Sequence, residues 1–406
     1  MSQRGAPWYP KSRGYIGPAP QRKRNLDFGF SEEQEMLRRS ARSLLERECP
    51  SAHVRQMMED ERGYSPELWR KMAGLGWLGL VLPEEHGGAG LNYVDLVVVA
   101  EEMGRVLLPS PFIWTLMFAE AVGRAGSDEQ KRRFLPAVAR GDIVATAAHL
   151  EANGSWEESG ITMAARKSGA GFVLDGDKLF VNDAHVADFF LVAARTGSKR
   201  GGHKGGAGVT LFAIDAKRPG ITVTPLKTMD RTRKLGAVAF RGLKASFADV
   251  VGEVNGGWPV LAAAIDRAKV ALAAEMMGGA EKVLETAVAY TKVREQFGRP
   301  IGSFQAVQHK CANMMVDVEG AKSAVYYAAW AVSNDAADAE TAAAVAKAAA
   351  SDAYRRTAAD GIQVHGGIGF TWEHDMHLYF KRAKSSEFTF GDANFNREIV
   401  AQLIGL

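Results

Sequence analysis

Cysteine is scarce in this sequence, and long apolar runs are missing. Among its 406 residues only Cys49 and Cys311 are cysteines, too few for a disulfide framework, and neither belongs to a cluster with the spacing of a metal site. We therefore expect two buried structural thiols and no metal site. No apolar stretch reaches the roughly 18 residues of a membrane-spanning helix, so the sequence predicts a cytoplasmic protein without a membrane span.

Acidic side chains are absent from the first 24 residues, which hold six basic residues, four prolines and no apolar run. Such a segment cannot bury enough apolar surface to fold alone, so residues 1–25 are predicted to be a disordered basic tail. It lacks the apolar core of a secretory signal. The whole chain has a formal net charge of +3, and without the six tail charges the rest is about −3. A surface that binds nucleic acid lies on a basic face of a folded domain, and we therefore expect no nucleic-acid partner.

Helical periodicity dominates the first and last thirds of the chain. Ser31 followed by Gln34 is the pattern of a capping box at the start of a helix. The C-terminal region contains three long helical patterns, and the third is rich in alanine, which permits close helix packing; together they predict an antiparallel four-helix bundle. The predicted helices beyond the first cover residues 66–76, 93–107, 111–125, 128–140, 258–291, 303–333, 336–364, 375–386 and 393–404.

Short apolar runs typical of strands fill the middle of the chain. Asp175–Gly176, between two such runs, predicts a hairpin turn. The Gly-rich basic segment 196–208 lacks the terminal Lys-Ser/Thr of a phosphate-binding P-loop and a following helix, so we expect it to be a hairpin loop. The sequence predicts an α+β fold with four parts: the tail 1–25, an N-terminal helical domain 26–145, a small β-domain 146–253 and a C-terminal four-helix bundle 254–406.

Two C-terminal segments identify a family. REQFGRPIGSFQAVQHKCANM (294–314) and QVHGGIGFTWEHDMHLYFKRAK (363–384) resemble acyl-CoA dehydrogenases, and the likeness extends over nearly all of 26–406. The resemblance implies a flavoprotein that binds FAD between domains, acts on an acyl-CoA and passes electrons to an electron-transfer flavoprotein. It also implies a homo- or hetero-oligomer, a dimer or tetramer, because in this family the neighbouring subunit covers the adenosine and pyrophosphate half of FAD.

The resemblance assigns cofactor contacts residue by residue. Arg294 would meet the pyrophosphate, a task that suits a permanent planar cation, and Phe297 would pack on the adenine side. Gly366 and Gly367 would bring backbone close to the phosphates, because glycine has no Cβ. The predicted FAD contacts are Arg294, Gln296, Phe297, Phe304, Gln305, Gln363, Val364, Gly366, Gly367, Phe180, Asn182 and Asn394.

The β-domain departs from the family pattern. The family's Thr-Glu-Pro-rich FAD loop corresponds to 147–156, where this chain has AAHLEANGSW. The Trp-x-Thr stretch along the flavin ring corresponds to Phe180-Val181-Asn182. Phe180 could still stack on the ring and Asn182 could still hydrogen-bond its edge; an ordinary strand with Phe180 in the core is the alternative.

The catalytic base of the family has no counterpart at either of its usual positions. The family removes a proton α to the thioester carbonyl with a glutamate whose pKa is raised in a dry pocket. Aligned on Gly391 and Arg397, that glutamate position is Phe390, and the alternative position on the first bundle helix is Ala268. Neither side chain can accept a proton.

Asp392, two residues beyond the usual base, has three interpretations: it supplies the carboxylate, it contacts the FAD ribose, or it caps the final helix. For the substrate, Asp266 and Lys269 match positions near the CoA moiety, although a helix charge in solvent or at an interface is equally compatible with them. The Phe390 amide could donate to the thioester carbonyl, and Gly391 would let the thioester pass close to the backbone.

Three functional hypotheses follow. The chain could be an autonomous acyl-CoA dehydrogenase that uses Asp392. It could be one subunit of a hetero-oligomer, itself catalytic or not, that completes the FAD site of a related subunit carrying the base. The motifs that would contact the FAD of a neighbouring subunit are retained, whereas those that would contact FAD within the same subunit are lost. This contrast favours the hetero-oligomer. Such an enzyme would suit a bulky substrate, such as a thioester derived from a steroid side chain or ring. Because one fold hosts many reactions, a flavin oxidase or monooxygenase is the third.

Overall fold

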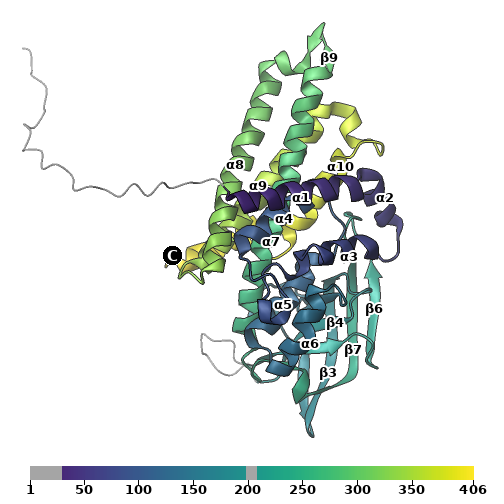
Figure 1. The fold of residues 1–406 in the computed structure, drawn as a ribbon, viewed down its shortest axis with the longest axis vertical. Helices are drawn as coiled ribbons and strands as arrows, with labels where there is room; N and C mark the ends of the chain where they lie inside the picture. The colour runs from purple at the N-terminus through teal and green to yellow at the C-terminus, as the bar shows by residue number, and fades with distance from the viewer. Residues whose placement is uncertain (1–29, 198–207) are drawn as a thin grey trace, which may run out of the picture.

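The computed structural model describes residues 30–197 and 208–406. N-terminal helices pack beside a mixed sheet, and a C-terminal helical bundle extends away from both (Figure 1). The predicted α+β architecture, with helices on either side of a β-region in sequence, is confirmed.

The N-terminal helices begin at the predicted capping box. The Ser31 hydroxyl accepts from the Gln34 amide N–H, and the Gln34 side chain accepts from the Ser31 N–H. Helix α4 is buried over almost its entire length. Helix α1 covers one side of it, and the Arg42 guanidinium of α1 donates to the Glu102 carboxylate of α4. The helices are α1 (Glu32–Glu48), α2 (Ser51–Glu59), α3 (Pro66–Gly74), α4 (Tyr93–Arg105), α5 (Phe112–Ala125) and α6 (Asp128–Ala139), with short 3-10 turns at Trp77–Gly79 and Glu84–His86.

The sheet follows the order β6-β7-β3-β2-β4-β5-β8, with β1 parallel to β4. Its inner face carries a separate apolar core that includes Phe172, Phe190, Phe212 and Phe240. The strands are β1 (Ala145–Ala148), β2 (Ala164–Ser168), β3 (Gly171–Asn182), β4 (Phe189–Arg195), β5 (Val209–Asp215), β6 (Ile221–Leu226), β7 (Leu235–Ser246) and β8 (Val250–Val251), with 3-10 turns at Glu158–Gly160 and Phe247–Asp249.

The hairpin turn predicted at Asp175–Gly176 is wrong. Both residues lie inside β3, where the register against β7 shifts between Leu174 and Gly176. The Asp175 carboxylate accepts from the Gly242 N–H across that irregularity. The Asp-Gly pair therefore forms a β-bulge, a feature with the same residue preferences as a turn, and the chain reverses at 169–170 between β2 and β3.

Strands β4 and β5 are antiparallel neighbours, with Arg195 opposite Val209. The Gly-rich segment predicted to join them as a hairpin loop lies mostly at 198–207, outside the described residues.

The C-terminal helices α7 to α10 pack together, and α4 packs against α7. Alanines at the α9 contacts, such as Ala343, Ala346 and Ala350, are fully buried, so the helices approach closely. A short β9–β10 hairpin joins α7 to α8 at the end of the bundle furthest from the sheet (Figure 1). The elements are α7 (Gly257–Val293), β9 (Glu295–Gln296), β10 (Arg299–Pro300), a 3-10 turn (Ile301–Ser303), α8 (Gln305–Ser333), α9 (Ala339–His365), a 3-10 turn (Gly366–Phe370), α10 (Met376–Phe388) and α11 (Ala393–Leu403).

The two cysteines differ in environment. Cys49 is buried, and burial raises the pKa of its thiol to about 12, so it is unreactive. Cys311 is only partly buried, which corrects the prediction of two buried thiols; its side of α8 lies at the bundle surface. Over 30–197 and 208–406, no helix is long and apolar enough to cross a membrane, and no group of His, Cys, Asp and Glu is placed to hold a metal.

Candidate functional site

The tip of the bundle presents the first set of predicted FAD contacts to solvent. Arg294 ends α7, is exposed, and makes no side-chain hydrogen bond or ion pair with the described residues. Phe297, at the turn of the β9–β10 hairpin, is 92% exposed and has a φ of 56°. An apolar ring so exposed points to a binding surface. Gln296 and Gln305 are also exposed, and Phe304 packs edge-on against Phe297 with ring centroids 6.0 Å apart.

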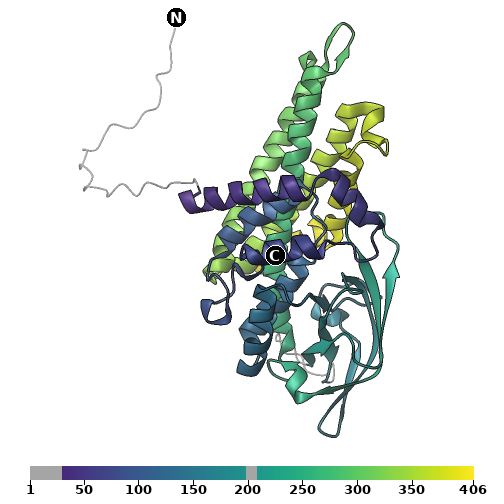
Figure 2. The same cartoon turned by 45° about the vertical axis from the view of Figure 1, so that its right-hand side comes forward.

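The second set lies at the end of α9. Gly366 has a φ of 63°, and nothing lies within 4 Å of where a Cβ on Gly366 or Gly367 would be. Gln363 is exposed, whereas Val364 is buried and offers only its backbone. His365 stacks on Tyr290 of α7 at 4.4 Å and bonds the Gly361 carbonyl through Nδ1 at 2.7 Å. This stack places the end of α9 against the last turn of α7 (Figure 2).

These two sets fit a dinucleotide. An exposed guanidinium, bare glycine backbone and an exposed aromatic ring are what a pyrophosphate and a planar base require. All of them lie on the outer surface at this end of the bundle.

The family's base position is filled by an apolar ring. Phe390 has no exposed surface and a φ of 60°. Its ring lies 5.1 Å from the ring of Trp114 on α5 and 5.3 Å from that of Trp156 in the loop after β1, and Trp156 in turn lies 5.1 Å from His149. We call Trp114, Phe390, Trp156 and His149 the aromatic column. Sequence comparison located Phe390 but not the other three members.

His149 is a buried neutral imidazole. Burial, together with the nearby Lys178 ammonium, lowers its pKa to about 3. Neither ring nitrogen has a hydrogen-bond partner among residues 30–197 and 208–406, although the His149 backbone carbonyl accepts from Lys178 Nζ at 3.2 Å. Leaving a buried donor and acceptor unpaired costs roughly 1–3 kcal/mol for each group.

Asp392 caps α11. Its carboxylate accepts from the Phe395 N–H at 2.8 Å. The structure therefore shows Asp392 as a helix cap, with its carboxylate directed at the helix backbone. The amide of Asn396 fixes the same turn by donating to the carbonyls of Phe390, Gly391 and Asp392. Asn394, a predicted cofactor contact, is exposed on the first turn of α11.

Lys347 is a buried cation that sequence comparison missed. Its ammonium donates to Ser351 Oγ at 2.7 Å and to the carbonyls of Glu387 and Gly391 at 3.0 Å each. Burial lowers the pKa of Lys347 to about 7, and the nearby Lys269 adds to this effect. A single lysine within the run AAAVAKAAAS was the available signal.

The predicted CoA-contacting residues pair with each other. Lys269 Nζ lies 3.1 Å from an oxygen of Asp266, and Lys269 is buried. Burial raises the pKa of Asp266. Ala268, the alternative base position, is also buried. Gly391 has a φ of 82°, and a Cβ there would lie 2.1 Å from the Phe395 ring, so only glycine fits this turn.

The flavin-ring segment lies at the end of β3. Phe180 has a φ of 54° and is half exposed, which excludes the alternative of a core phenylalanine. Asn182 is buried, and its side-chain amide lies 3.5 Å from the Phe180 carbonyl. A non-glycine residue at positive φ with an exposed ring is a strained arrangement of the kind found at binding sites.

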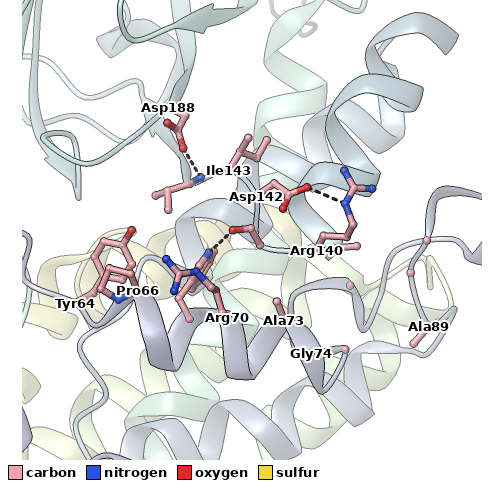
Figure 3. Close-up of a pocket in the computed structure, with 18 residues that line it drawn as sticks. Tyr64, Pro66, Arg70, Ala73, Gly74, Ala89, Arg140, Asp142, Ile143 and Asp188 are labelled. Atoms are coloured by element: carbon pink, nitrogen blue, oxygen red, sulfur yellow. Dashed lines mark hydrogen bonds and ion pairs between the residues drawn. The ribbon is translucent and has the colours of Figure 1, made fainter.

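A prominent cleft lies away from all of these residues. It has a volume of about 830 Å3 and lies between α3 and the 139–144 segment (Figure 3). Trp69 Nε1 donates to the Gly141 carbonyl, and Asp188 accepts from the Val144 N–H. None of the predicted site residues lines this cleft or the larger cleft of about 1000 Å3 between Met58–Arg62 and Pro225–Thr228, so cavity size does not identify the site here.

Comparison with known proteins identifies the class. Family models match the acyl-CoA dehydrogenase N-terminal domain over residues 31–142, the middle domain over 149–242 and the C-terminal domain over 255–405. The chain belongs to the acyl-CoA dehydrogenase family. It is an oxidoreductase of the class that acts on acyl-CoA.

Individual relatives are similar over nearly the full length. Acyl-CoA dehydrogenase IpdE2 of Mycobacterium tuberculosis (strain ATCC 25618 / H37Rv) is 37% identical over 356 residues, which cover 87% of this chain and 92% of that protein. A variant of the Tcur3481-Tcur3483 steroid ACAD is 32% identical with a TM-score of 0.82, covering 92% of this chain and 98% of that chain. A chain of the ChsE4-ChsE5 complex from Mycobacterium tuberculosis is 31% identical with a TM-score of 0.84, and the match covers 94% of this chain and 100% of that chain.

Proposed function

We propose that this chain is one subunit of a hetero-oligomeric acyl-CoA dehydrogenase, in which it completes the FAD site of a related subunit that carries the catalytic glutamate. One contrast carries this proposal. Arg294, Phe297 and Gly366–Gly367 are exposed at the bundle tip, whereas the family's base position in this chain is a fully buried phenylalanine.

The proposed contribution of this chain is positional and electrostatic. FAD, when bound, accepts the hydride that leaves the β-carbon of the acyl thioester. Arg294 would neutralise the pyrophosphate, and the Gly366–Gly367 backbone would approach it closely. Phe297 would cover the adenine side and exclude water. Phe304, Gln305, Gln296 and Gln363 would complete the outer wall of the same site.

Two relatives support the pairing and a bulky substrate. The Tcur3481-Tcur3483 structure is described as a steroid ACAD, and ChsE4-ChsE5 as a complex of two components. We propose a thioester derived from a steroid side chain or ring as the substrate, and an electron-transfer flavoprotein as the electron acceptor. The tetramer or dimer would contain both kinds of subunit.

Autonomous catalysis through Asp392 is the competing function. The Phe395 N–H holds one oxygen of the Asp392 carboxylate toward α11, and the aromatic column stands where the substrate would approach residue 390. This geometry favours the partner role over the autonomous one.

Expression with and without a partner tests the proposal. The chain purified alone should be colourless, and co-expression with a glutamate-bearing homologue should give a yellow complex that an acyl-CoA bleaches without oxygen. Replacing the partner's glutamate by glutamine should leave the yellow colour and abolish bleaching. A chain that is yellow alone and bleached by acyl-CoA contradicts the proposal.

A further inference from the structure

The predicted pyrophosphate contacts come from two helices that end close together. Arg294 follows the last residue of α7, and the Gly366–Gly367 turn follows the last residue of α9. A bound group needs such contacts at a fixed spacing, because a site that is loose by roughly 1 Å does not hold its ligand in the correct geometry. The contacts that join the last turns of α7 and α9 therefore set the geometry of this site.

Three aromatic rings join these two helix ends. Tyr290 lies in the last turn of α7, and its ring stacks on that of His365, the last residue of α9, with centroids 4.4 Å apart. The His365 ring in turn lies 4.7 Å from that of His374, in the segment before α10, and we call these residues the three-ring cluster. The Arg294 N–H donates to the Tyr290 carbonyl at 2.9 Å. His365 directly precedes Gly366, so the cluster is tied to both predicted contacts.

Hydrogen bonds fix the orientation of both imidazoles. His365 Nδ1 donates to the Gly361 carbonyl, one turn back along α9, at 2.7 Å. His374 Nδ1 accepts from the Met376 N–H at 3.1 Å, and the His374 carbonyl accepts from the guanidinium of Arg55 on α2 at 3.3 Å. Neither ring can rotate without breaking a hydrogen bond, so the cluster holds the two helix ends as one rigid unit.

The inner and outer sides of this region differ in packing. A Cβ on Gly361 would lie 2.5 Å from a methyl group of Val283 on α7, and one on Gly369 would lie 3.1 Å from the His365 Cβ. In contrast, nothing lies within 4 Å of the Cβ positions of Gly366–Gly367. The end of α9 is therefore packed tightly against α7, whereas the glycine turn that follows is open to a ligand.

We infer that Tyr290, His365 and His374 are positioning residues for the FAD site at the bundle tip. Their packed rings hold the ends of α7 and α9 at one spacing, so that the Arg294 guanidinium and the glycine backbone reach the same pyrophosphate. His365 is buried, and the cluster therefore acts through these two contacts rather than by touching the cofactor. The inference rests on the proposed function, in which that FAD belongs to the related subunit.

Substitutions of Tyr290, made in the complex with the related subunit, test the α7 side of the cluster. Tyr290→Leu removes the ring contact but keeps an apolar side chain, and it should weaken FAD binding roughly 2- to 10-fold, the value of one aromatic pair. Tyr290→Phe keeps the ring and should bind FAD as the wild type does. Flavin fluorescence after dilution measures the dissociation constant. Wild-type FAD binding by Tyr290→Leu, or an equal loss in both variants, overturns the inference.

His365→Leu tests the α9 side, and it keeps the inference testable if Tyr290→Leu fails to fold. It should weaken FAD binding by a similar factor. The control is Phe247→Ala, which removes a ring pair with Phe172 in the sheet domain, where the centroids are 5.3 Å apart; it should leave FAD binding unchanged. Unchanged FAD binding in His365→Leu, or an equal loss in the control, would show that the three-ring cluster does not position the cofactor.

A double-mutant cycle tests whether the cluster acts through Arg294. Tyr290→Leu combined with Arg294→Ala should weaken FAD binding by less than the product of the two single effects, because the effects of residues that act through one another are not additive. A loss equal to that product would show that the ring of Tyr290 acts independently of the guanidinium, which contradicts a positioning role.

The same measurements separate this inference from the proposed function. If Arg294→Ala alone leaves FAD binding by the complex unchanged, the proposed function fails and the inference fails with it. If Arg294→Ala weakens FAD binding but Tyr290→Leu and His365→Leu do not, the inference alone fails and the proposed function stands.

Discussion

Gly104 of α4 and Gly278 of α7 lie at one helix crossing, each directly against the backbone of the other helix. A Cβ on Gly104 would be 1.8 Å from the Glu275 carbonyl oxygen, and a Cβ on Gly278 would be 1.8 Å from the Glu101 carbonyl oxygen. The two main chains therefore touch with no side chain between them, and this contact joins the N-terminal helices to the bundle.

Alanine at either glycine should separate the helices. We expect Gly104→Ala or Gly278→Ala to lower the free energy of unfolding by roughly 3 kcal/mol, at the upper end of overpacking costs. Gly123→Ala on α5 is the matched control, because nothing lies within 4 Å of its Cβ position; it should raise stability by about 0.5–1 kcal/mol. Urea unfolding measures both. Equal effects of the three substitutions would show that the crossing is not tightly packed.

Arg382 should be among the most sensitive charged residues. It is almost fully buried, lies 2.6 Å from Glu275, and donates to Thr232 Oγ1 at 2.7 Å. Arg382→Met leaves Glu275 with only Arg233 and should cost about 3–5 kcal/mol. Arg397→Met, which removes an exposed pair with Asp352, should cost less than about 1 kcal/mol. Similar losses of unfolding free energy in the two variants would show that burial does not determine the cost of breaking the ion pair.

Lys347 should make stability depend on pH in the alkaline range. The folded protein has a Lys347 pKa of about 7, and the usual value is 10.5. Between these values the unfolded chain binds a proton that the folded chain lacks, so stability should rise with pH through this interval. Glu387 and Asp392 partly oppose the shift, and Lys269 reinforces it. The difference in unfolding free energy between wild type and Lys347→Met should therefore grow in favour of wild type from pH 6.5 to 9; a constant difference would show that Lys347 does not titrate in this range.

Arg294 should control flavin retention by the complex. A charge-assisted hydrogen bond contributes about 1.5–3 kcal/mol, so Arg294→Ala should weaken FAD binding about 10- to 100-fold. Lys292→Ala removes a neighbouring exposed cation and should have little effect. Flavin released on dilution, followed by fluorescence, measures the difference. Equal flavin retention in both variants would remove Arg294 from the cofactor site.

Asp392 should behave as a helix cap. Asp392→Ala should lower the free energy of unfolding by about 1 kcal/mol, whereas Asp392→Asn, which also caps well, should be nearly neutral. Both variants should retain acyl-CoA-dependent bleaching in the complex. If Asp392→Asn abolishes bleaching while stability is unchanged, the carboxylate is the base and the autonomous function regains support.

Helix positions were predictable because their signals are local. The capping box at Ser31 and the periodic runs placed most helix boundaries within a few residues of those observed, for example 258–291 against Gly257–Val293. The Asp-Gly pair failed because a bulge and a turn prefer the same residues, and only the partner strand β7 distinguishes them.

The contents of the site were less predictable than its location. Comparison by motif placed Phe390 at the base position, but Trp114, His149 and Trp156 come from segments separated by up to 276 positions from it and meet only in the folded chain. No local pattern marks a tryptophan as packing against residue 390. The three possible roles of Asp392 likewise differ in which group bonds its carboxylate. That group is the Phe395 N–H, and the sequence alone does not show this bond.

The exposed ring of Phe297 has a consequence for copies of this chain that lack the proposed partner subunit. Such a copy leaves the ring in water at the tip of the bundle. Exposed apolar surface favours non-specific association, so unpaired copies should aggregate more readily than assembled ones.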